Sequence, residues 1–190
     1  MRRRLAVAIA GTLLAGLSAA CATGSGSGTE QPATTEEPVT TYDLRQPPAR
    51  EDLGVQTGSA VVTQRFDEPT SVRLRLPADR ELRVQVTLVA ADSYAGAPDV
   101  ESAPPTGMDM HTTLMSLQEA AQVMRESLEQ LGTSPDPVDP WVRKASLAEG
   151  SERIRSANLE TRLGYLSIRL QGRYSPLDGR ASVSYSLYWG

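Results

Sequence analysis

The sequence has very little cysteine, histidine or lysine. Cys21 is the only cysteine and His111 the only histidine among 190 residues. A lone cysteine excludes a framework of intrachain disulfides and a cysteine-cluster zinc site, and a lone imidazole excludes a metal site built from several histidines. Lys144 is the only lysine beside many arginines, a bias that we attribute to GC-rich codon usage. The net charge of −4 argues against nucleic acid as a partner.

The motifs of common enzyme classes are also missing. The chain has no Gly-x-Ser-x-Gly, no phosphate-binding glycine loop, no His-Glu-x-x-His and no dinucleotide fingerprint. A Ser-His-Asp triad would have to use His111, and nothing in the sequence places a serine and an acid beside it. We therefore expect a protein that is not an enzyme.

The first residues are typical of a secretion signal. Arg2–Arg4 are followed by the uncharged stretch Leu5–Leu17, which is shorter than the ~20 residues that a membrane-spanning helix needs. The next residues complete the segment Leu17-Ser18-Ala19-Ala20-Cys21, which resembles the lipobox of bacterial lipoproteins. Ser18 stands where that family most often has leucine. An ordinary signal peptide with an incidental cysteine is the alternative.

The resemblance implies a location and a modification. Residues 1–20 would be a signal peptide, and Cys21 would carry a covalent diacylglycerol, with palmitate as a typical acyl chain, at the extracytoplasmic face of the cell membrane. Two acyl chains hold a protein on a bilayer because each buried CH₂ contributes ~0.8 kcal/mol. Loss of Arg2–Arg4 would take the net charge from −4 to −7.

Composition divides the rest of the chain into a tether and one domain. Residues 21–54 are rich in Gly, Ser, Thr, Pro and Glu and contain few aliphatic residues, which predicts a disordered tether. Residues 55–190 are long enough for a single domain.

Alternating apolar residues predict two β-hairpins in this domain. In the first, Leu76 should lie opposite Leu82 and Arg75 opposite Arg83. In the second, around a turn at 175–179, Leu170 should lie opposite Val183. Residues 92–110 resemble a loop, and residues 141–155 are ambiguous, with a strand at 141–147 as one possibility.

One amphipathic helix is expected between the hairpins. Apolar residues from Leu114 to Leu131 recur at steps of three and four, Thr112 or Thr113 can cap its start, and Gly132 can end it. The expected fold class is α+β, an antiparallel sheet with one long amphipathic helix packed on one face, preceded by the disordered tether. The other face would meet solvent or a partner.

The most unusual local cluster combines thioethers with the single imidazole. Its members are Met108, Met110, His111 and Met115. These ligand types suit Cu(I), so copper is a candidate cofactor. The alternative is that the methionines fill gaps in the core.

Two further sets of residues are candidate binding sites. Arg73, Arg75 and Arg83 should share the outward face of the first hairpin and could bind phosphate groups, unless acids such as Glu81 neutralise them. Tyr165 and Tyr188 should lie on the outward, serine-rich face of the second hairpin, where their rings could stack on a sugar or a protein.

The sequence therefore predicts a membrane-anchored extracytoplasmic lipoprotein that acts as a non-enzymatic binding or scaffolding module of the cell envelope. Its partners would be the membrane, through the lipid anchor, and a glycan or another envelope protein. The alternative function is a lipoprotein that handles copper or a small ligand through Met108, Met110, His111 and Met115.

Overall fold

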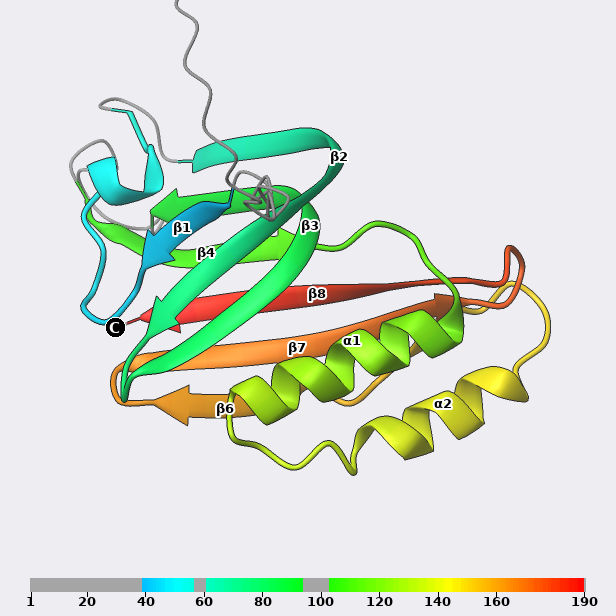
Figure 1. Cartoon of the computed structure of the whole chain (residues 1–190). Coiled ribbons are helices and arrows are strands. Elements are labelled where there is room, and N and C mark those ends of the chain that lie inside the picture. The colour runs from blue at the N-terminus through cyan, green and yellow to red at the C-terminus, as the bar shows by residue number, and fades with distance from the viewer. Residues whose placement is uncertain (1–38, 57–60, 94–102, 190) are drawn as a thin grey trace, which may run out of the picture. The chain divides into compact units, whose positions relative to one another are not determined.

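The computed structural model describes residues 39–56, 61–93 and 103–189 (Figure 1). In these residues, eight strands form one sheet in the order β1-β2-β3-β4-β8-β7-β5, and β6 also pairs with β7. The elements are β1 (Thr40–Asp43), the 3₁₀-helix η1 (Glu51–Leu53), β2 (Val61–Leu76), β3 (Arg80–Ser93), β4 (Pro105–His111), α1 (Leu117–Gln130), α2 (Val138–Ser146), β5 (Ile154–Arg155), β6 (Leu159–Leu163), β7 (Leu166–Ser175) and β8 (Arg180–Trp189).

The expected fold class, an α+β domain with an antiparallel sheet and one long helix, is wrong. The sheet is mixed because β1 runs parallel to β2, with Tyr42 opposite Leu74. Strands dominate the described residues, and the helical part consists of two short α-helices instead of one long one. Neither β1 nor α2 was expected from the sequence.

α1 is shorter than expected because a capping box fixes its start at Ser116. The Ser116 hydroxyl accepts a hydrogen bond from the backbone N–H of Glu119 at 3.2 Å, and the Glu119 carboxylate accepts one from the Ser116 N–H at 2.8 Å. Thr112 therefore does not cap the helix, and Leu114 is exposed. Gly132, with φ of 73°, follows the helix end as predicted.

α2 occupies residues for which a strand was one of the expectations. Val138, Trp141 and Ala145 are buried on one side of it, a spacing of three and four that suits a helix. Pro140 lies in the first turn, where a missing N–H costs nothing.

β4 lies within the segment 92–110 that was expected to be a loop. Met108 and Met110 are buried, and the strand pairs with β3 on one side and β8 on the other. The glycine in its middle fits a close approach, because a Cβ on Gly107 would lie 3.0 Å from the Leu187 carbonyl oxygen.

The folded domain begins before Val55. Tyr42 and Leu44 are buried in the core. The backbone N–H of Leu44 donates to the Arg75 carbonyl at 2.7 Å, and its carbonyl accepts from the Tyr165 hydroxyl at 2.6 Å. Residues 39–54 are therefore part of the domain, not of a tether, and the rest of the expected tether lies outside the described residues.

Both hairpins keep the predicted faces but differ from the predicted register by two residues. Leu82 lies opposite Leu74 instead of Leu76, and Leu170 lies opposite Tyr185 instead of Val183. A shift of two preserves which side chains point to the core, because side chains alternate with a period of two. It also places Arg75 opposite Glu81, not opposite Arg83.

β3 changes its buried face along its length. Val84 and Val86 are buried in one half, and Val89 and Ala91 in the other. β3 pairs with β4 only from Leu88 onward, so its first half diverges from β4. α1 packs beside that half, and the Gln130 side chain accepts a hydrogen bond from the Arg83 N–H at 2.8 Å. α1 thus packs on one face of β7 and β8 and beside the first half of β3.

Candidate functional site

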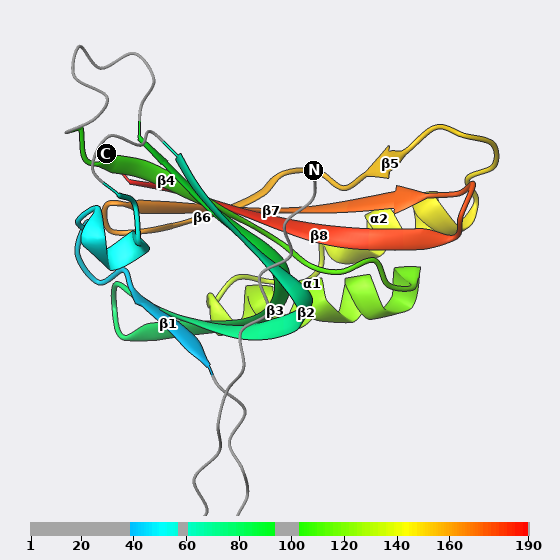
Figure 2. The same cartoon turned by 90° about the horizontal axis from the view of Figure 1, so that it is seen from above.

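The strands β4, β8, β7, β6 and β5 present a polar surface on the side away from α1, which we call the outer face. α1 packs against β7 and β8 and lies on one side of these strands in Figure 2. Because strand side chains alternate, the residues between the buried ones point to the other side. These residues are Asp109, His111, Arg155, Glu160, Arg162, Ser167, Arg169, Gln171, Arg173, Ser182, Ser184, Ser186 and Tyr188.

The strand register aligns these side chains in rows across the outer face. One row runs from Asp109 through Ser186 and Arg169 to Glu160. Within it, the Ser186 hydroxyl donates to the Asp109 carboxylate at 2.5 Å, and the Arg169 guanidinium lies 3.4 Å from the Glu160 carboxylate. Each acid at an end of this row is thus paired with a donor from the neighbouring strand.

A neighbouring row carries hydroxyl and amide groups. Ser184 lies between His111 and Gln171. The Gln171 side-chain amide donates to the Asn158 side-chain oxygen at 2.7 Å, and the Ser184 hydroxyl donates to the Gln171 carbonyl at 3.3 Å. The surface is thus rich in fixed hydrogen-bonding groups.

Tyr188 is the exposed aromatic ring of this surface, with 46% of its area accessible. The guanidinium carbon of Arg169 lies 5.8 Å from the ring centroid, within the range of a cation–π contact. The Nε of Arg169 is buried and has no hydrogen-bond partner among the described residues. The ring and this guanidinium form one aromatic and cationic patch.

Three further arginines lie where β5 and β6 meet β7. Arg155 of β5 lies directly opposite Arg173 of β7, and Arg162 of β6 lies opposite Ser167. All three arginines are exposed. Sequence reasoning missed Arg155 and Arg162 because β5 has only two residues and β6 has apolar residues only at its two ends.

Tyr165 does not share the outer face with Tyr188. It lies in the turn between β6 and β7 and is half-buried, and its hydroxyl donates to the Leu44 carbonyl at 2.6 Å. Burial raises its pKa, and the carboxylate of Asp43 raises it further. The structure therefore assigns Tyr165 to the packing of the N-terminal segment.

The structure does not bring the four predicted copper ligands together. Met108 and Met110 point into the core, whereas His111 alternates with them and lies on the outer face. Met115 precedes α1 and pairs with Ala181. The described residues also contain no group of three or more His, Cys, Asp or Glu side chains placed to hold a metal ion.

Serine, histidine and acid side chains do meet on the outer face, but not as a catalytic triad. The Ser186 hydroxyl donates to Asp109 and the Ser184 hydroxyl to the Gln171 carbonyl. Among the described residues, neither hydroxyl is hydrogen-bonded to the imidazole of His111.

Three arginines of the first hairpin share one acid, Glu81. The Glu81 carboxylate accepts a hydrogen bond from Arg83, and it lies 3.5 Å from the Nε of Arg73. These arginines lower the pKa of Glu81, Arg83 most of all. Arg75 lies opposite the same acid. At the phosphate site predicted at Arg73, Arg75 and Arg83, the Glu81 carboxylate therefore already occupies the position of an anion.

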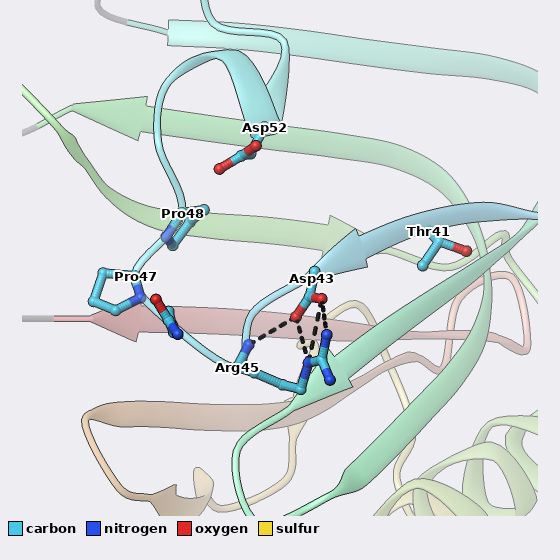
Figure 3. Close-up of a pocket in the computed structure, with 7 residues that line it drawn as sticks. Thr41, Asp43, Arg45, Pro47, Pro48 and Asp52 are labelled. Atoms are coloured by element: carbon cyan, nitrogen blue, oxygen red, sulfur yellow. Dashed lines mark hydrogen bonds and ion pairs between the residues drawn. The ribbon is translucent and has the colours of Figure 1, made fainter.

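A groove of about 710 Å³ lies beside β1 and the following loop (Figure 3). Its charged groups satisfy one another. Arg45 donates to the Asp43 carboxylate from its backbone N–H at 3.2 Å and from Nε at 2.9 Å, which lowers the pKa of Asp43 to about 2. Asp52 accepts from the Ala49 N–H at 2.9 Å. The groove therefore offers little unsatisfied polarity to a ligand.

Because His111 is the only histidine, its pKa can be measured without overlap from other imidazoles. Burial lowers the pKa of His111, with a smaller opposing effect of Asp109 and a further lowering by Arg173. Folding then favours the neutral imidazole, so stability should decrease as the pH falls below the unfolded pKa of about 6.5. We expect the one imidazole NMR signal to titrate with a midpoint below 6.5.

The variant His111→Gln is the control for this titration. The difference in thermal midpoint between wild type and variant should change with pH only below about 6.5. A midpoint for the imidazole at or above the ordinary value would contradict the placement of His111.

The described residues include no helix that is long and apolar enough to span a membrane. The lipobox-like segment, Leu17–Cys21, lies outside the described residues. No protein-family model, no curated protein and no solved structure matches the chain.

Proposed function

We propose that this protein is a membrane-anchored extracytoplasmic lipoprotein whose domain binds an envelope component reversibly through the outer face, without catalysing a reaction. The observation that carries the proposal is the outer face itself. It combines rows of fixed donors and acceptors with an exposed ring at Tyr188, on the side of the strands that α1 does not cover.

The chemistry of the outer face favours a reversible contact. Stable protein–protein interfaces have an apolar core, whereas the outer face is made of serine, glutamine and charged side chains around one tyrosine. Many of the polar groups already hydrogen bond to one another, so a contact with a ligand must replace an existing hydrogen bond or a bound water, which limits its affinity. A binding module with modest affinity fits this surface better than an obligate dimer.

The anchor is supported by the lipobox resemblance at Leu17–Cys21 and by the fact that Cys21 is the only cysteine. Residues 22–38 separate Cys21 from the first described residue, Val39. In the proposed function, the anchor keeps the domain near its partner and raises the effective concentration of an otherwise weak interaction.

Lipidation is tested by Cys21→Ala. We expect wild-type protein to incorporate radiolabelled palmitate and to sediment with membranes, because two acyl chains hold it there. Cys21→Ala should lose the label and either appear in the soluble fraction or retain its signal peptide. Ser18→Leu, which restores the commonest lipobox residue, is the matched control and should keep both properties. An unlabelled wild-type protein would refute the anchor.

Binding through the outer face is tested independently of ligand chemistry. A photo-crosslinking amino acid at Ser167, beside Tyr188 in the register, should capture an envelope component in intact cells. The same amino acid at Glu129, exposed on α1, should not capture that component. Equal capture at both positions would show that the outer face is not the binding surface.

A further inference from the structure

We infer that the ligand of the outer face is an anionic polysaccharide, and that Arg155 and Arg173 bind its carboxylate or phosphate groups. This inference rests on the proposed function, because it takes the outer face as the binding surface. It adds the chemical class of the ligand and the residues that select it.

The first argument is local charge. Four arginines, Arg155, Arg162, Arg169 and Arg173, lie along three adjoining strands of the outer face, against two acids, Glu160 and Asp109, which both lie in the row of Arg169. The whole chain carries a net charge of −4. A concentrated positive surface on an acidic protein attracts an anion to that surface in preference to the rest of the molecule.

The second argument is the direct opposition of Arg155 and Arg173. Residues opposite each other on antiparallel strands have Cβ atoms about 5 Å apart, and like charges there are unfavourable without an anion between them. Among the described residues neither guanidinium is paired with a carboxylate, although the Nε of Arg173 donates to the Gln171 side chain at 3.1 Å. That hydrogen bond fixes the Arg173 side chain while its terminal nitrogens can still bind an anion.

The third argument is the surface that continues from this arginine pair. Along β7 the outer face passes from Arg173 to Ser167, six residues or about 20 Å, and it ends at the Tyr188 ring opposite Ser167. Hydroxyl and amide groups line that path. A sugar chain offers hydroxyls for such groups and an apolar ring face for a tyrosine, so an extended glycan matches the length and the chemistry together.

The experiment uses full-length, lipidated protein in detergent and two polymers with the same backbone, neutral dextran and carboxymethyl-dextran. We expect the protein to bind carboxymethyl-dextran in biolayer interferometry, with an affinity that falls as salt is raised, and to bind dextran at least about tenfold more weakly, a difference of ~1.4 kcal/mol.

The variant Arg155→Gln/Arg173→Gln should lose about tenfold in affinity for carboxymethyl-dextran. The matched control is Arg75→Gln/Arg143→Gln, which removes the same charge from exposed arginines of β2 and α2. It should bind as wild type does. Thermal unfolding of both variants will establish that the domain is intact.

Three results of the polymer experiment would overturn the inference. They are absence of binding to carboxymethyl-dextran, equal binding of the two polymers, and equal loss in both double variants, which would show a response to net charge alone. Selective crosslinking at Ser167 to a protein or a lipid would also overturn it while leaving the proposed function standing. Equal crosslinking at Ser167 and Glu129 would instead remove the proposed function itself.

Discussion

A chain that lacks residues 22–54 is expected to lose most of its folding stability, whereas one that lacks residues 22–38 is expected to keep it. The longer deletion removes Tyr42, Leu44 and Leu53, which are all buried. Full burial of such a side chain contributes about 1.5–3 kcal/mol, so the three together represent about 5–9 kcal/mol. That is comparable to the total stability of 5–15 kcal/mol of an ordinary domain.

The longer deletion also removes hydrogen-bonding partners. β1 leaves the edge of β2, and the Tyr165 hydroxyl loses the Leu44 carbonyl that accepts from it at 2.6 Å. Urea unfolding of the two deletion variants measures the effect. Leu44→Ala in the full chain provides a smaller change at the same site, with an expected cost of about 2–5 kcal/mol. Equal stability of the two deletion variants would show that residues 39–54 do not belong to the domain.

Residues 39–54 could not be recognised from the sequence as part of the domain. Around β1, Thr, Pro and Glu dominate the composition, and the buried side chains of residues 40–46 are Tyr42 and Leu44. Two alternating apolar residues are too few for a period of two to be recognised. Their burial depends on a parallel pairing with β2, and a long-range contact of this kind leaves no local signal.

The hairpins show what local patterns do determine. The alternation of apolar residues correctly predicted which side chains of 72–76, 166–170 and 183–189 point to the core. The register depended on the turns, which the pattern does not specify. Ala78 and Asp79 both adopt positive φ, 58° and 53°, and the turn covers 77–79 instead of 78–80. Alanine rarely adopts this conformation, so its position in the turn was not foreseeable.

The outer face was foreseeable only in part. Tyr188 belongs to a strand with clear alternation, and the sequence correctly placed it on the outward side. Arg155 belongs to the two-residue strand β5, which pairs with the far end of β7. Arg162 belongs to β6, which forms a tight hairpin with β7 but has apolar residues only at its two ends. The prediction of a copper site relied on closeness in the sequence. Met110 and His111 are adjacent in sequence, but neighbours in a strand point to opposite faces.

Gly172→Ala is expected to destabilise the domain by about 1–3 kcal/mol, as overpacking of a core does. A Cβ at this position in β7 would lie 2.7 Å from the sulfur of Met124 and 2.8 Å from ring atoms of Trp141. The glycine thus marks where the helices pack most closely on the sheet.

Hydrogen bonds hold both the backbone of Gly172 and the ring of Trp141 in place. The backbone of Gly172 is held by Ser156, whose N–H donates to the Gly172 carbonyl at 2.9 Å and whose hydroxyl accepts from the Gly172 N–H at 2.9 Å. On the other side, Trp141 is buried and its ring N–H lies 3.5 Å from the Ile154 carbonyl. Met124 is the more adaptable neighbour because its side chain is unbranched and flexible.

A double-mutant cycle identifies the cause of the loss. Met124→Ala removes the sulfur that the new methyl group would meet, so the cost of Gly172→Ala should be smaller in the Met124→Ala background than in wild type. Gln171→Ala, on the outer side of the same strand, should change the free energy of unfolding by no more than about 0.5 kcal/mol. Chemical denaturation of the four members of the cycle gives the coupling. Strict additivity would mean that the methyl group does not contact Met124, and that α1 lies farther from β7 than the structure places it.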